Sequence, residues 1–156
     1  MTLAKRLVCT TKKLGFNREE TIYTNALLLC SADASSINAA LKKKGFNNIK
    51  ELIKCSMEFF AEVTIPLSQP ELIIAYSNGN TSPSAAKIFL DTFGLEETFY
   101  QQDSSRYKTT YSFIAKIGDL HVPVVGIRHM SRFKPDINNI RSAWDVQKTK
   151  LQQLNL

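Results

Sequence analysis

A histidine and a serine two residues apart, His129 and Ser131, follow an apolar stretch that runs from Pro123 to Ile127. An imidazole, a hydroxyl and the neighbouring Arg128 can hydrogen-bond a ligand or polarise it. Open α/β sheets bind their ligands outside the carboxyl ends of their strands, which is where these side chains would lie. This segment is therefore the first place to expect a functional site. The other histidine, His121, begins the predicted strand that contains this stretch, and we assign it no role.

The chain carries a net charge of +6, and cations gather near its carboxyl end. A basic surface of this kind attracts phosphate backbones. The same charge is also typical of an ordinary solvated surface, so charge by itself leaves both interpretations open. Between residues 128 and 150 the cations are Arg128, Arg132, Lys134, Arg141, Lys148 and Lys150, against Asp136 and Asp145.

Two further segments place polar side chains after apolar ones. Asn25 follows the stretch 21–24, and its amide could read the edge of a base or cap the backbone. Residues 77–84 are small and polar and precede a predicted helix. They could bind a phosphate at the helix N-terminus or form a plain turn between strand and helix.

The periodicity of apolar residues predicts alternating helices and strands, followed by a hairpin whose turn is Gly118-Asp119. This order indicates one α/β domain over residues 1–156, a three-layer α/β/α sandwich with a small mixed sheet. Helices are predicted over residues 3–14, from 48 to about 66, from 81 or 82 to about 93, and after 135. A further short helix is predicted after the polar loop of residues 31–36 and ends at about residue 44. Strands are predicted over 21–29, 71–77, 109–117 and 121–127.

Three cysteines in apolar or helical surroundings fit buried thiols in a reducing compartment better than a disulfide framework. No zinc-binding spacing and no apolar stretch long enough to cross a bilayer is present. We therefore expect a cytoplasmic protein without a metal or another cofactor.

The order and spacing of three segments resemble the uracil-DNA glycosylase superfamily. Residues 15–25 are similar to the helix, turn and strand that end in the base-reading Asn of that family. Residues 70–80 are similar to the strand and glycine-containing loop that grip a DNA phosphate. His129-Met-Ser131 matches the late His-x-Ser motif of the family.

The resemblance implies a role for each matching residue. Asn25 would read the base, and Gly79 and Asn80 would hold a phosphate. His129 would donate a hydrogen bond to the departing base, and Ser131 would contact the DNA backbone.

The residues after the motif form a wedge in family members, which enters the minor groove as the nucleotide flips out. By position, Arg132 and Phe133 would supply the wedge here. Arg128, Arg132 and Lys134 would add contacts to DNA phosphates.

The first catalytic motif of the family has no counterpart in this chain. Family members begin with a central strand and a Gly/Pro-rich loop, which hold a water-positioning carboxylate or Asn and an aromatic residue that stacks on the base. This chain starts with the helix that should follow them, and Glu19 and Glu20 lie at the wrong end of their predicted strand. We therefore expect other strands to close the gap in the sheet. The implied function is a DNA-binding protein with lost or reduced base excision, a pseudoenzyme related to DNA repair.

Two alternatives remain open. The same fold could serve as an inhibitor or accessory subunit whose basic surface meets an acidic protein partner. It could also be an active glycosylase whose water is held by another residue, such as Asp33 or Asn78. DNA binding that weakens steeply with salt would favour the first function over the protein-interaction module, and an assay of base release would decide the enzymatic alternative.

Overall fold

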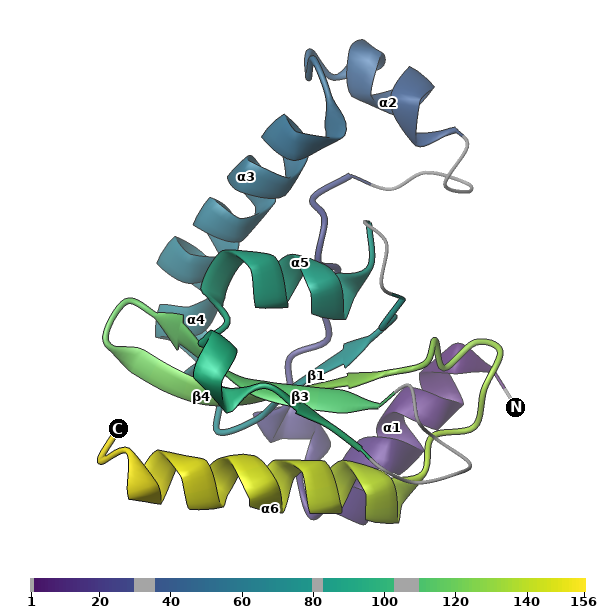
Figure 1. The fold of residues 1–156 in the computed structure, drawn as a ribbon. Coiled ribbons are helices and arrows are strands. Elements are labelled where there is room, and N and C mark those ends of the chain that lie inside the picture. Colours follow the sequence, from purple (N-terminus) through teal and green to yellow (C-terminus); the bar gives the residue numbers. More distant parts are fainter. Residues whose placement is uncertain (1, 30–35, 80–82, 103–109) are drawn as a thin grey trace. The chain divides into compact units, whose positions relative to one another are not determined.

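A computed structural model describes residues 2–29, 36–79, 83–102 and 110–156 (Figure 1). The chain divides into two compact units, one of Met1–Ile22 with Pro70–Leu156 and one of Tyr23–Gln69. That residues 1–156 form a single domain stays a prediction.

The larger unit contains a four-stranded mixed sheet with the strand order β1-β4-β3-β2. β1 is parallel to β4, whereas β3 is antiparallel to both β4 and β2. Ile117 pairs with Leu120, so Gly118 and Asp119 make the two-residue turn that the sequence predicted. The strands are β1 (Ile73–Tyr76), β2 (Tyr100–Gln101), β3 (Tyr111–Ile117) and β4 (Leu120–Ile127).

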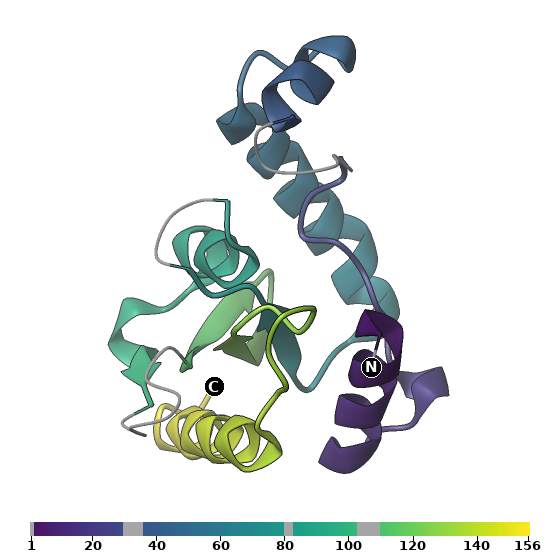
Figure 2. The same cartoon turned by 90° about the vertical axis from the view of Figure 1, so that its right-hand side faces the viewer.

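Helices cover both faces of this sheet (Figures 1 and 2). Helix α5 (Ala85–Phe93) packs against β1, β3 and β4. Helix α6 (Ile137–Gln153) packs against β3 and β4 on the other face, and α1 (Leu3–Leu14) lies beside α6. Burial on both faces explains the nearly continuous apolar sequence of β4. The structure thus confirms an α/β fold with a small mixed sheet.

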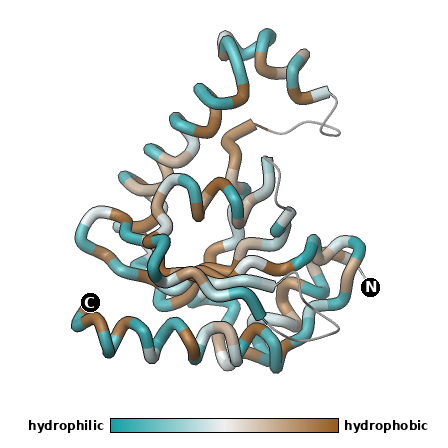
Figure 3. Tube along the Cα trace, viewed as in Figure 1, coloured by the Kyte–Doolittle hydropathy of each residue, from teal (hydrophilic) through white to brown (hydrophobic). Residues whose placement is uncertain are grey.

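Side chains alternate across β4 and divide the core in two. Gly126 faces α5 and approaches Ala86, whereas Val125 and Ile127 face α6. The α6-facing cluster also takes in Leu14, Met130, Ile140 and Ala143. Figure 3 shows the corresponding apolar colouring along the strands.

Capping residues set the ends of the two helices beneath the sheet. Thr2 caps α1, which ends at Gly15 in the left-handed conformation with a φ of 98°, as its sequence predicts. At the start of α6, the Asp136 carboxylate accepts the backbone N–H of Asn139 over 3.1 Å. Two short 3-10 helices, η1 (Arg18–Glu20) and η3 (Glu96–Thr98), complete the described helices of this unit.

The smaller unit is helical throughout its described elements. It contains α2 (Ile37–Lys43), α3 (Ile49–Phe59), the π-helical η2 (Phe60–Thr64) and α4 (Ile65–Ser68). The last three run on from one another and extend slightly past the helix predicted over 48–66. Pro66 lacks an N–H and would clash with a carbonyl of a regular helix, and the wider π-turn just before it relieves that clash.

The strand predicted over residues 21–29 is wrong, because this segment forms no regular secondary structure. Its apolar side chains suggested a buried strand, but Ile22 and Leu28 are 55% and 56% exposed. The backbone N–H of Leu28 donates to the Ser56 hydroxyl over 3.0 Å instead of to a neighbouring strand. Asn25 therefore does not end a strand.

The expectation of buried cysteines is wrong for Cys55, which is exposed, while Cys9 is half-buried. Cys30 lies outside the described residues. None of the helices in the described ranges has the length and apolar character needed to cross a bilayer.

Candidate nucleic-acid interface

Two of the three predicted segments meet at one edge of the sheet. Since β1 and β4 are parallel, their carboxyl ends lie side by side, with Tyr76 paired to Ile127. The buried Asn78 then donates its side-chain N–H to the Gly126 carbonyl over 3.3 Å. The Tyr76 and His129 rings also meet edge to face, with their centroids 5.5 Å apart.

Ser131 fixes the hydrogen bonding of the exposed His129 ring. Its backbone N–H donates to His129 Nδ1 over 3.2 Å, and its hydroxyl oxygen lies 2.7 Å from the same nitrogen. A backbone N–H can only donate, so Nδ1 accepts, and in the neutral ring the proton sits on Nε2. The His-x-Ser spacing thus leaves Nε2–H as the donor that the ring can present to a ligand.

The residue between them, Met130, anchors the turn to the rest of the unit. Its side chain is buried in the core next to α6, and its carbonyl accepts a hydrogen bond from the Arg6 guanidinium on α1. The His129 carbonyl in turn accepts the backbone N–H groups of Arg132 and Phe133, both over 3.1 Å. Two of these three hydrogen bonds lie within the turn and the third joins it to α1, and together they hold His129 in place.

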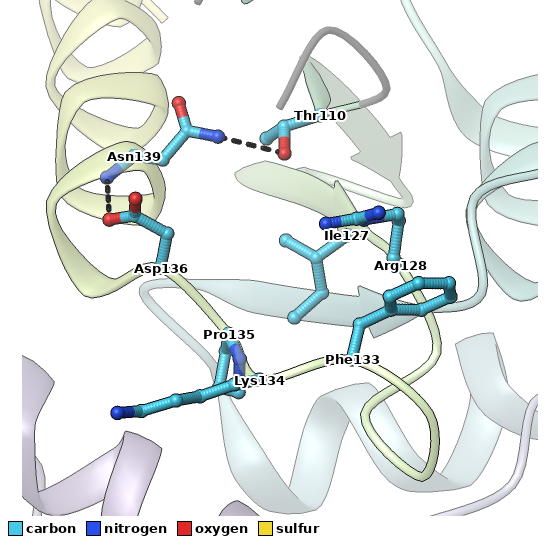
Figure 4. Close-up of a pocket in the computed structure, with 8 residues that line it drawn as sticks. All are labelled: Thr110, Ile127, Arg128, Phe133, Lys134, Pro135, Asp136 and Asn139. Carbon is cyan, nitrogen blue, oxygen red and sulfur yellow. Dashed lines mark hydrogen bonds between the residues drawn. The ribbon is translucent and has the colours of Figure 1, made fainter. Parts of the chain in front are cut away.

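One of the predicted cations, Arg128, lies against an exposed aromatic ring, that of Phe133 (Figure 4). The Arg128 guanidinium stacks over Phe133, 4.0 Å from the ring centroid. Phe133 is nevertheless 41% exposed, and Arg132 and Lys134 on either side of it are exposed as well. The arrangement combines positive charge with an accessible aromatic surface.

A small pocket adjoins this ring, between the end of β4 and the start of α6 (Figure 4). Asn139 crosses it to donate to the Thr110 hydroxyl over 3.0 Å. Sequence reasoning missed Thr110, Asp136 and Asn139 as neighbours of the site, although Asp136 was recognisable as a helix-capping residue type ahead of α6. The pocket is lined by Thr110, Ile127, Arg128, Phe133, Lys134, Pro135, Asp136 and Asn139.

The predicted phosphate loop is described only in part, since Asn80 lies outside the described residues. Gly79, the other predicted phosphate-binding residue of this loop, is exposed. Helix α5 begins at Ala85, later than predicted. The Ser84 hydroxyl and the Ala86 N–H both donate to the Ser77 carbonyl, over 2.8 and 3.0 Å. Two donors at the start of α5 are therefore bonded to the residue that follows β1.

No described contact brings Asn25 to this edge. Asn25 is exposed in the unit of Tyr23–Gln69, and its base-reading role stays a prediction. Asp33 lies outside the described residues. Asn78, the other candidate for holding a water, uses its amide to tie the end of β1 to β4.

Comparisons of this chain with protein-family models, with curated proteins and with solved structures found no match. Within residues 2–29, 36–79, 83–102 and 110–156, no three His, Cys, Asp or Glu side chains are grouped to hold a metal ion. The turn of residues 128–134, which we call the His129 turn, is therefore the feature from which a function can be inferred.

Proposed function

We propose that this protein binds DNA through the turn of residues 128–134 and the basic segment that follows, in the manner of a uracil-DNA glycosylase with lost or reduced base excision. One observation carries the proposal. The Ser131 N–H and hydroxyl hold His129 so that Nε2–H is its donor, at a strand end where Arg128, Arg132 and Lys134 cluster.

The charge of the turn suits a nucleic acid. Arg132 and Lys134 are exposed, and the chain as a whole carries a charge of +6. Cations that neutralise phosphates release condensed counterions, which supplies affinity without reading sequence. A fixed Nε2–H donor adds a directional contact, suited to a carbonyl oxygen on a base.

The chemistry of base release explains why we expect little activity. Hydrolysis of the N-glycosidic bond requires stabilisation of the departing base, a positioned water and support for the sugar cation. His129 can meet the first requirement. Among the described residues that line the adjoining pocket, Asp136 is the one carboxylate, and it already caps α6 through Asn139. Losing a general base alone typically costs about 10²–10⁴-fold in rate.

Binding and base release can be measured on the same oligonucleotides. We expect uracil-containing single- and double-stranded DNA to be bound, with affinity falling steeply between about 50 and 200 mM salt. We expect no measurable abasic product. Absence of binding to either DNA at low salt would overturn the proposed function. Abasic product that disappears in His129→Ala would show instead that catalysis is retained.

A further inference from the structure

The Phe133 ring is partly covered by a cation. The Arg128 guanidinium covers one face, 4.0 Å from the centroid. Phe133 is still 41% exposed, so the guanidinium leaves part of this residue accessible to solvent. In the sequence, Phe133 stands between two exposed cations, Arg132 and Lys134. Proteins that bind single-stranded nucleic acids combine positive charge with exposed aromatic side chains, on which the bases stack.

We propose that the open face of Phe133 is a stacking platform for one unpaired base, and that single-stranded DNA is therefore the preferred partner of this site. The proposal rests on the proposed function, since it assumes that the turn of residues 128–134 binds DNA.

The covered face argues against the wedge that sequence position predicted for Phe133. A side chain inserted into a base stack has a base against each of its faces. Here one face is already occupied by Arg128, so insertion would require the guanidinium to leave the ring. An unpaired base needs only the open face, and the stacked guanidinium stays where it is.

The turn also holds the platform at a fixed place among the cations. The Phe133 and Arg132 N–H groups both donate to the His129 carbonyl, and the buried Met130 anchors the turn. Arg132 precedes Phe133 and Lys134 follows it. A strand whose base rests on the ring therefore lies next to a turn that carries two exposed cations.

The test measures binding of a labelled oligothymidine of about 15 nucleotides and of a duplex of equal length, at one moderate salt concentration. We expect the wild type to bind the single strand more tightly. Phe133→Ala should weaken single-strand binding roughly 5- to 150-fold, the range for loss of one stacked base, and duplex binding far less. Phe133→Trp should retain the preference, whereas Phe133→Leu, which is apolar but cannot stack, should lose it.

Phe99→Ala is the matched control, because Phe99 is 42% exposed and lies outside the turn. It should leave both affinities unchanged, and circular dichroism checks that every variant is folded. Equal losses on single strand and duplex, or wild-type binding by Phe133→Leu, would overturn the platform while leaving DNA binding intact. If the wild type binds neither DNA at low salt, the proposed function fails, and the platform fails with it.

Discussion

The hydrogen bonds that His129 makes through Nδ1 come from an immediate neighbour in the sequence. Ser131, two residues on, supplies both groups that contact Nδ1, while Met130 between them is buried. Residues 129–131 therefore contain both partners of these contacts, which is why the His-x-Ser spacing could be recognised from the sequence. The contact from Arg6 could not, because it joins residues 124 positions apart.

Arg6→Ala tests that long-range contact. Without the guanidinium, the Met130 carbonyl loses its donor, so we expect the free energy of unfolding to fall by about 1 kcal/mol. DNA affinity should fall as well, since the turn that carries His129 is less firmly held. Denaturant unfolding and DNA-binding titrations measure the two effects.

Lys5→Ala is the matched control for Arg6. It removes the same charge from a neighbouring, exposed position of α1. Equal losses of stability and affinity in the two variants would show that Arg6 acts through its charge alone and not through Met130.

Among the elements, β4 connects the core to the site. Its Gly126 approaches α5 so closely that an added Cβ would lie 2.8 Å from the Ala86 Cβ and 3.2 Å from Tyr111 Cε2. The Gly126 carbonyl also accepts the hydrogen bond from Asn78. Close packing of α5 and the position of the β1 end thus depend on the same residue.

Gly126→Ala should accordingly destabilise the protein by about 1 to 3 kcal/mol, the usual cost of overpacking a core. The matched substitution Gly79→Ala meets no atom of the described residues closer than 3.9 Å and should leave stability nearly unchanged. Thermal or denaturant unfolding compares the two. A Gly126→Ala variant as stable as Gly79→Ala would contradict the close approach of α5 to β4.

The Tyr111 side chain makes β3 sensitive to alkaline pH. Burial, and secondarily the charge of Asp91, raises the pKa of Tyr111 from 10.0 to about 12. The folded protein then holds the phenol proton to a higher pH than the unfolded chain does, so stability should decline as the pH rises from about 10 to about 12. The Tyr111 hydroxyl has no hydrogen-bond partner among the described residues.

Tyr111→Phe removes this titration and the unpartnered hydroxyl together. We expect a variant at least as stable as the wild type at neutral pH, with a shallower loss of stability above pH 10. Unfolding midpoints measured across that range give the comparison. An identical alkaline decline in the two proteins would assign the decline to other groups.

Most elements of the larger unit could be predicted because local signals mark them. Gly15 ends α1, Gly118-Asp119 closes the hairpin, and the apolar residues of β4 match a strand that is buried on both faces. The prediction failed for residues 21–29, since apolar and β-branched residues favour a strand only where a partner strand can pair with them. No local signal reveals whether such a partner exists.

On the scale of the whole molecule, clustered cations occur in both compact units. The turn of residues 128–134 belongs to the larger unit, whereas Lys42, Lys43 and Lys44 lie at the end of α2 in the smaller one. Composition predicts a basic protein but does not say which cations meet a ligand. Only the contacts around His129 favour the first group over the second.

The salt dependence of DNA binding by two triple variants tests the central claim most directly. In Arg128→Ala/Arg132→Ala/Lys134→Ala, the plot of log affinity against log salt should become shallower, by roughly 0.7 per lost phosphate contact on single strands and 0.9 on duplex. In Lys42→Ala/Lys43→Ala/Lys44→Ala, which removes the same charge from exposed positions, the wild-type slope should persist. A wild-type slope and affinity in the first variant, or equal losses in both, would contradict DNA binding through the His129 turn.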